Sequence, residues 1–124
     1  MLSPSKKKYL LTIYELSRSG ERLRVTRIAG ALRVSKPSVC RMVQSLAEEG
    51  LLAREEGGKI ALTRAGEDTC CELHRQYLAL CRFFRAGGCG EEVAISDASA
   101  CLMLSEEGLD ALLAAVGSAA AGTE

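Results

Sequence analysis

Apolar residues recur every three or four positions through most of this chain, and this spacing predicts a mainly helical fold. Within residues 25–46 it predicts two short helices. Their apolar faces are Val25, Ile28, Ala29 and Leu32 in the first, and Val39, Met42, Val43 and Leu46 in the second. Residues 51–56 and 59–63 are predicted as two short strands instead. Gly57-Gly58 between them is typical of a tight hairpin.

Polar and special residues mark the ends of these two helices. Thr26 and Ser35 carry hydroxyls that can accept hydrogen bonds from the unpaired amides at a helix start. Pro37 falls in the first turn of the second helix, where a missing amide hydrogen costs nothing. Gly50 tolerates the positive φ common after a helix C-terminus. Residues 23–63 are therefore predicted to form a helix-turn-helix followed by a wing, which indicates duplex DNA as the partner.

Four more helices are predicted around this motif. One begins at a Ser5 cap and ends near Ser17, and another runs from Arg64, after a Thr63 cap, to about Arg85. Apolar residues of the latter are spaced like a coiled-coil seam: Cys70, Leu73, Tyr77, Leu80 and Phe84.

The last two predicted helices follow the glycines at 87, 88 and 90. The first covers residues 91–104, and Ser105 can cap the second. The second has an apolar stripe of Leu109, Leu112, Leu113 and Val116.

These elements predict a mainly α fold with a small β-wing. We assign residues 1–63 to an N-terminal winged helix-turn-helix DNA-binding domain and residues 64–116 to a helical dimerisation domain. Residues 117–124 are expected to form a disordered tail. Because the chain has no apolar stretch long enough for a membrane span and no signal-peptide pattern, we expect a cytoplasmic protein without a membrane partner.

The formal net charge of zero conceals two oppositely charged halves. Residues 1–64 carry 13 Lys and Arg against 6 Asp and Glu, whereas residues 65–124 carry 3 against 10. A basic half that holds the helix-turn-helix suits binding to phosphates, and an acidic half suits a separate oligomerisation module.

A recognition helix reads base edges with the outward-facing residues of its first turns. The candidates here are Ser35, Lys36, Pro37, Ser38, Arg41 and Gln44. Arg41 suits O6 and N7 of guanine, and the Pro37 ring suits a thymine methyl. Candidates for phosphate contacts are Arg27, Arg54 and Lys59, with Arg24 and Arg64 beside them. The alternative for any one of these cations is a solvated surface charge.

Four segments together carry a resemblance to a known family: YLLTIYELSRSGE, VTRIAGALRVSKPSVCRMVQSLAEEGLL, ALTRAGE and LHRQYL. With them the chain resembles the diphtheria-toxin-repressor-like family of iron- and manganese-dependent transcriptional regulators, in a short two-domain form. The resemblance implies a homodimer, a divalent Fe or Mn cofactor, and DNA contacts at Ser35, Pro37, Ser38 and Arg41.

At the metal positions the chain departs from the family pattern. Lys8 and Leu11 stand where the resemblance implies ligands in the first helix, and Ser99, Leu102 and Met103 stand where it implies them in the penultimate helix. Only His74 remains as a ligand of the expected kind, because a hard divalent ion needs carboxylate or imidazole groups. We expect an altered or lost metal response, and Lys8 is a candidate to occupy the ion's place electrostatically.

Six cysteines form no C-x-x-C pair, so neither a zinc ribbon nor a thioredoxin-like site is indicated. Cys71, His74 and Cys81 are predicted to share one face of the long helix, with Cys101 or Met103 approaching from the next one. This set could hold zinc or copper(I). The alternative is that the thiols fill a core as small apolar groups.

The leading hypothesis is a homodimeric, sequence-specific DNA-binding repressor that recognises half-sites about one helical turn apart. Two alternatives stay open: a dimerising winged-helix protein-interaction module without autonomous DNA binding, and a thiol or soft-metal sensor. An enzyme is not expected, because the sequence has neither a glycine-rich phosphate loop nor a nucleophile elbow and holds one His.

Overall fold

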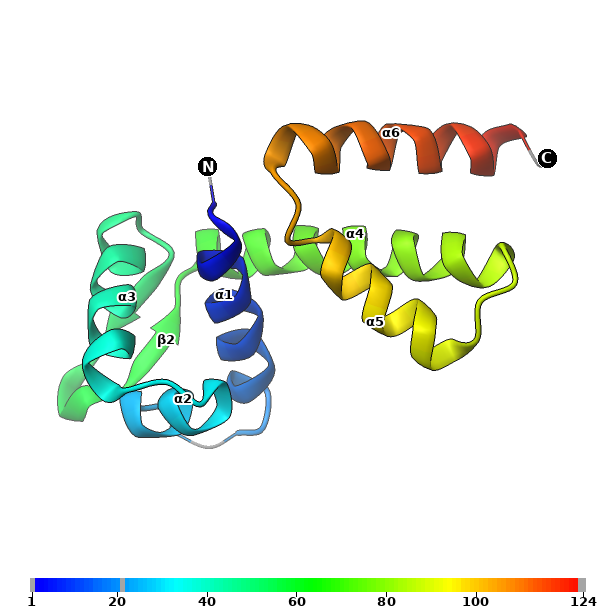
Figure 1. Ribbon diagram of the computed structural model, residues 1–124. Helices are drawn as coiled ribbons and strands as arrows, with labels where there is room; N and C mark the ends of the chain where they lie inside the picture. Colours follow the sequence, from blue (N-terminus) through cyan, green and yellow to red (C-terminus); the bar gives the residue numbers. More distant parts are fainter. Residues whose placement is uncertain (1, 21, 123–124) are drawn as a thin grey trace. The chain divides into compact units, whose positions relative to one another are not determined.

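The computed structural model describes residues 2–20 and 22–122. Its elements, in chain order, are α1 (Pro4–Ser17), α2 (Val25–Leu32), α3 (Lys36–Glu48), β1 (Leu52–Arg54), the short 3-10 helix η1 (Glu56–Gly58), β2 (Ile60–Leu62), α4 (Arg64–Ala86), α5 (Glu91–Cys101) and α6 (Glu106–Gly122) (Figure 1). The predicted mainly α fold with a small β-wing is confirmed.

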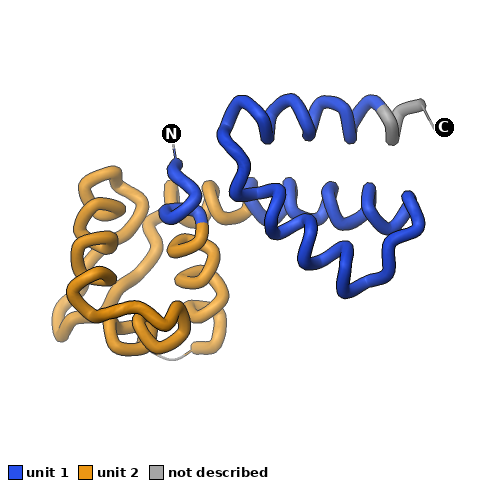
Figure 2. Tube along the Cα trace, viewed as in Figure 1, with its two compact units in different colours: residues 1–7, 72–124 blue, residues 8–71 orange. Residues whose placement is uncertain are grey.

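The chain forms two compact units, which are coloured separately in Figure 2. One unit comprises residues 8–71, and the other comprises residues 1–7 together with residues 72–124. The division therefore falls inside α4, eight residues after the boundary predicted at 63/64, and the first seven residues group with the helical unit.

The unit of residues 8–71 is built around an aliphatic core. Its buried side chains come from α1, the segment before α2, α2, α3, both strands and the start of α4: Leu10, Ile13, Leu23, Ile28, Val39, Val43, Leu46, Leu52, Ile60 and Cys70. Burial of each large aliphatic side chain contributes about 1.5–3 kcal/mol. The predicted faces of α2 and α3 supply this core, although Val25, Leu32 and Met42 are only half-buried.

The wing is a two-stranded antiparallel hairpin in which Leu52 pairs with Leu62 and Arg54 with Ile60. Its turn is tight because Gly57 and Gly58 adopt φ values of 75° and 80°, which L side chains rarely adopt. The amide of Ile60 also donates to the carbonyl of Leu23, at 2.8 Å, so the segment before α2 is bonded to the wing.

Two predicted helix caps are wrong. α1 begins at Pro4, and its cap is Ser3, whose Oγ accepts from the Lys6 amide at 3.3 Å, rather than Ser5. α2 begins at Val25, so Thr26 lies inside it, and its N-cap Arg24 makes no side-chain cap bond. Because the Leu23 carbonyl is bonded to the wing, the helix starts directly afterwards, where the Arg24 carbonyl accepts from two amides.

The caps predicted at Ser35, Thr63 and Ser105 are confirmed. The hydroxyls of Ser35, Thr63 and Ser105 accept from the amides of the residues three positions later, at 3.3, 3.1 and 3.1 Å respectively. Gly50 follows α3 with φ 79°, and the Leu51 amide bonds back to the Leu46 carbonyl at 3.0 Å.

The helical unit buries apolar residues from the C-terminal part of α4, from α5 and its C-cap, and from α6. They are Leu73, Leu80, Ala94, Ala98, Leu102, Leu109 and Val116. Within the predicted seam of α4, Leu73 and Leu80 are thus buried in this chain's own core, while Tyr77 and Phe84 are half-buried.

Two predicted boundaries in this unit differ from the structure. α5 ends at Cys101, not Leu104, because the amides of Met103 and Leu104 turn back to carbonyls three residues earlier. α6 continues to Gly122, so the tail expected to be disordered from residue 117 is helical that far. Residues 123–124 lie outside the described part of the chain.

Candidate DNA-binding interface

The N-terminal turn of α3 is ordered by its own hydroxyls. Ser35 accepts from the Ser38 amide, and the two Oγ atoms also share a hydrogen bond of 2.8 Å. Pro37 occupies the first turn without the loss of any amide bond. Ser35 and Ser38 are therefore held in place, and together the two hydroxyls keep one hydrogen and two lone pairs for further partners, whichever of them donates to the other.

One face of α3 is free for contacts. Its opposite face is fully buried through Val39, Val43 and Leu46. Exposed residues of the outward face and of the preceding turn are Ser35, Lys36, Pro37, Arg41 and Gln44. Pro37, Arg41 and Gln44 are spaced four and three residues apart, so they follow one stripe of the helix. The predicted base-contacting set is thus brought together on one exposed surface, with Ser38 half-buried at its edge.

Three predicted phosphate contacts are not equally accessible. Arg54 is exposed at the end of β1. Lys59 forms an ion pair with Glu55 at 3.6 Å, and its side chain is 43% exposed, so it can rotate to another partner. Arg27 is half-buried in α2, which limits its reach to a phosphate.

Two further arginines extend the basic surface. The guanidinium of Arg24 reaches the wing turn, since a Cβ placed on Gly57 would lie 3.9 Å from its Nη2. Arg33 is exposed in the turn before α3 and holds φ 56°, a left-handed conformation that a β-carbon disfavours. Arg24 was predicted as a phosphate contact, whereas Arg33 was not, although its position between two predicted helices was an available signal.

The soft-metal set is not assembled. In the part of the chain that the structure describes, no group of three or more His, Cys, Asp or Glu side chains could hold an ion. Cys71 and Cys81 are ten residues apart in α4, which is roughly 15 Å along a helix, whereas zinc–sulfur bonds are about 2.3 Å. The prediction of one shared site overlooked this rise along the helix axis.

The residues predicted to bind a soft metal ion each have a different environment in the structure. His74 is exposed and stacks on Tyr77, with ring centroids 6.0 Å apart. Cys81 Sγ donates to the Ala94 carbonyl at 3.8 Å. Burial, and then the charge of Asp97, raise the pKa of the half-buried Cys101 thiol. Met103 is half-buried.

The positions at which the family resemblance implies ligands do not fit a hard divalent ion. Leu11 and Leu102 have no side-chain lone pair, and the Ser99 hydroxyl donates to the Ile95 carbonyl at 2.9 Å. Lys8 is exposed, so the expectation that its ammonium replaces the ion is wrong.

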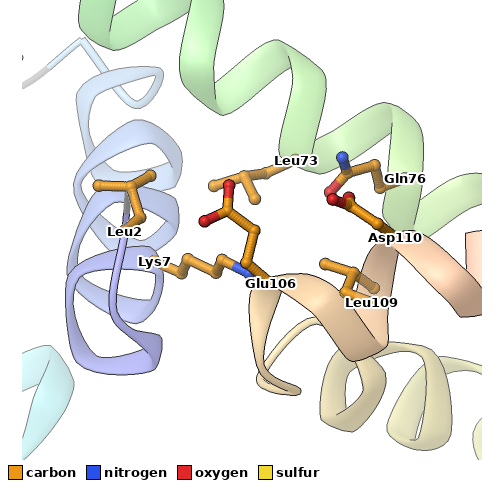
Figure 3. Close-up of a pocket in the computed structure, with 7 residues that line it drawn as sticks. All are labelled: Leu2, Lys7, Leu73, Gln76, Glu106, Leu109 and Asp110. Atoms are coloured by element: carbon orange, nitrogen blue, oxygen red, sulfur yellow. The ribbon is translucent and has the colours of Figure 1, made fainter.

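The buried lysine is its neighbour, Lys7. Its side chain is only 6% exposed, and Nζ donates to the Leu102 carbonyl at 3.0 Å. Lys7 also lines a cavity of about 240 Å³ together with Glu106 and Asp110 (Figure 3). The burial of Lys7 was not predicted, because nothing in the run of three lysines indicates which one points inward.

The sequence of this chain is similar to those of known transcriptional regulators. Residues 1–58 match the model of the iron dependent repressor N-terminal DNA binding domain. The chain is 35% identical, over 97 residues, to the HTH-type transcriptional regulator MntR of Lysinibacillus sphaericus (strain C3-41), and the match covers 78% of this chain and 70% of the relative.

Two solved structures have folds similar to that of this chain. The hypothetical protein SSo2273 from Sulfolobus solfataricus superposes with a TM-score of 0.72 at 27% identity, covering 94% of this chain and 91% of its own. The manganese regulator SloR gives 0.67 at 26% identity, covering 90% of this chain and 53% of its own. Separately, none of the helices in the described residues is long and apolar enough to cross a membrane.

Proposed function

Because the chain belongs to the diphtheria-toxin-repressor-like family of metal-dependent transcriptional regulators, we propose that it is a homodimeric, sequence-specific repressor that binds duplex DNA through α3 and the wing. The observation that carries the proposal is the exposed stripe of Pro37, Arg41 and Gln44 on a helix whose other face is buried. A helix held in this way can enter the major groove without losing its packing.

Each residue of the stripe has a chemical task in this proposal. Arg41 donates two hydrogen bonds to O6 and N7 of a guanine, and Gln44 forms two hydrogen bonds with N6 and N7 of an adenine. Pro37 makes an apolar contact with a thymine methyl. The Gln44 amide is 3.5 Å from Glu48 Oε1, a weak bond that it can exchange for a base edge. Lys36, Arg54 and Lys59 neutralise phosphates and fix the register of the helix in the groove.

Dimerisation is proposed to use the helical unit. Five large apolar side chains of α4, of α5 and of the turn after it are 39–50% exposed: Leu78, Phe83, Val93, Ile95 and Leu104. Exposed apolar groups of this size, gathered in a unit of three helices, suit an interface with a second copy. A two-fold dimer would present two copies of α3 to half-sites about one helical turn apart.

The test is selection of DNA ligands from a random library, followed by anisotropy titration of the selected duplex. Arg41→Ala should weaken binding about tenfold to a hundredfold and relax the preference at one base pair, as loss of a bidentate base contact does. Arg75→Ala is the matched control, because Arg75 is exposed on α4 and paired with Glu72 at 2.8 Å. It should bind like the wild type.

Two outcomes would contradict the proposal. If the wild-type protein selects no sequence and binds no duplex at low salt, α3 is not a recognition helix, and the protein is better described as a dimerising interaction module. If Arg41→Ala binds the selected duplex as tightly as Arg75→Ala does, the stripe on α3 is not the contact surface.

A further inference from the structure

We propose that the Lys7 ammonium is a built-in cation that stabilises the helical unit at Leu102, so that folding and DNA binding do not require a divalent metal. Leu102 stands at one of the positions where the resemblance implies a metal ligand. The inference about folding stands alone, and the inference about DNA binding rests on the proposed function.

The burial of Lys7 requires partners that compensate its charge. Lys7 is the one charged side chain buried in the described residues. An ammonium removed from water costs several kcal/mol unless partners replace the lost hydration. The structure supplies such a partner in the Leu102 carbonyl, 3.0 Å from Nζ. A buried cation that is held in this way contributes to one specific arrangement of its surroundings.

The carbonyl that accepts from Lys7 lies at the C-terminal end of a helix. Leu102 is the C-cap of α5, and its own amide bonds back to the Ala98 carbonyl. Carbonyls at a helix C-terminus lack intrahelical donors and carry the negative end of the helix dipole. A cation is therefore favourable at this end of α5, and Lys7 places one there.

The cavity beside Lys7 is lined by two acidic side chains. Glu106 and Asp110 are one turn apart on α6, and both line the cavity that Lys7 lines (Figure 3). The buried Oε1 of Gln76, another lining residue, has no hydrogen-bond partner. Two carboxylates and an unused amide oxygen favour positive charge in this cavity, and the ammonium provides it.

The same charge disfavours a metal ion there. An ammonium repels a nearby divalent cation, and Leu102 itself offers no side-chain ligand. The chain thus has a cation at this point that is covalently part of the protein and cannot dissociate.

The test compares thermal unfolding of wild type, Lys7→Met and Lys8→Met, each in EDTA and in excess Mn²⁺. Lys8 is the matched control, because it is the exposed neighbour with the same charge. We expect Lys7→Met to lower Tm by about 5 °C or more, the shift that loss of one charged hydrogen bond gives in a domain of this size. Lys8→Met should shift Tm by no more than about 1 °C, consistent with a surface substitution. Mn²⁺ should leave the wild-type Tm unchanged.

A second measurement covers the case in which Lys7→Met does not fold. In the wild-type protein, ¹⁵N NMR of lysine side chains should show one ammonium whose protons exchange slowly with water, and its signal should persist in Lys8→Met. Finding all lysine ammonium protons in fast exchange would overturn the proposal, as would equal melting of Lys7→Met and wild type or a rise in the wild-type Tm with Mn²⁺.

These readouts are independent of DNA. Absence of DNA binding would defeat the proposed function and leave the structural role of Lys7 intact. Conversely, if the wild-type protein binds its selected duplex only when Mn²⁺ replaces EDTA, the DNA-binding function survives and the inference of metal independence fails.

Discussion

Thr63 and Gly50 are joined by a hydrogen bond of 2.6 Å from the threonine hydroxyl to the glycine carbonyl. The same hydroxyl accepts from the Gly66 amide at 3.1 Å, and the Thr63 amide donates to the Leu51 carbonyl at 3.1 Å. One residue thus ties the end of the proposed recognition helix α3 to the start of α4. The wing is the chain between these two points, so Thr63 closes its base.

Thr63→Val should test this bond, since valine has the same shape and no hydroxyl. It leaves the Gly50 carbonyl and the Gly66 amide without their partner, and we expect the free energy of unfolding to fall by about 1–2 kcal/mol. Urea denaturation followed by circular dichroism measures the change. Thr26→Val is the control, because Thr26 is exposed inside α2 and caps no helix. Equal stability of the two variants would refute the role given to Thr63.

Gly66 requires the absence of a side chain. It is buried in the first turn of α4, and a Cβ there would overlap the Leu51 carbonyl oxygen. Helix propensity alone favours alanine over glycine by about 1 kcal/mol. Because backbone must move to relieve the overlap, we expect Gly66→Ala to destabilise the fold by roughly 2–4 kcal/mol instead.

Gly30→Ala provides the matched comparison. Gly30 lies inside α2, and a Cβ there meets nothing within 4 Å. We expect this variant to gain up to about 1 kcal/mol. Urea denaturation of both proteins should therefore give shifts of opposite sign, and shifts of the same sign would show that the approach of Gly66 to Leu51 does not constrain the fold.

Local sequence patterns predicted most of the winged unit. The buried face of α3, the Ser35 cap and the Gly57-Gly58 turn each depend on residues close in sequence, so periodicity and turn chemistry were enough. The prediction of a Thr26 cap was wrong for a non-local reason. The Leu23 carbonyl accepts a hydrogen bond from the Ile60 amide, and this bond fixes where α2 begins. A bond between segments 37 positions apart has no signature in the sequence of either one.

The burial of Lys7 was unpredictable for the same reason. Its partner, the Leu102 carbonyl, is 95 positions away, and a backbone acceptor carries no sequence signal. Choosing Lys7 over Lys8 requires knowing which direction each side chain of α1 takes. The resemblance directed attention to Lys8, which is exposed, because a resemblance identifies equivalent positions and carries no information on how substituted side chains pack.

The salt dependence of DNA binding should report the contribution of the wing. Each phosphate contact adds about 0.9 to the slope of log K against log salt. We expect Arg54→Ala, at the exposed end of β1, to reduce the magnitude of this slope by about 1 with little change in sequence preference. Arg82→Ala, an exposed substitution on α4, is the control and should leave the slope unchanged. Equal slopes for the two variants would remove Arg54 from the proposed interface.

The buried Cys70 thiol should make stability depend on alkaline pH. Burial, with smaller contributions from the charges of Cys71 and Glu67, raises its pKa from 9.0 to about 11. Cys70 Sγ also donates to the Leu10 carbonyl at 3.5 Å, a bond that the thiolate cannot make. In the unfolded chain the thiol ionises near pH 9, whereas in the folded chain it stays protonated. Its contribution to stability is therefore complete below pH 9 and is lost as the pH rises towards 11.

This dependence can be separated from that of other groups by comparing variants. Wild-type Tm should fall more steeply between pH 9 and 11 than the Tm of Cys70→Ala, which has no thiol to ionise at this position. Cys71→Ala removes an exposed thiol next to it and should follow the wild-type profile closely. Parallel profiles for wild type and Cys70→Ala would mean that Cys70 ionises alike in both states. The thiol would then be accessible to solvent, and thiol alkylation at pH 8 would modify Cys70 as fast as Cys71 instead of sparing it.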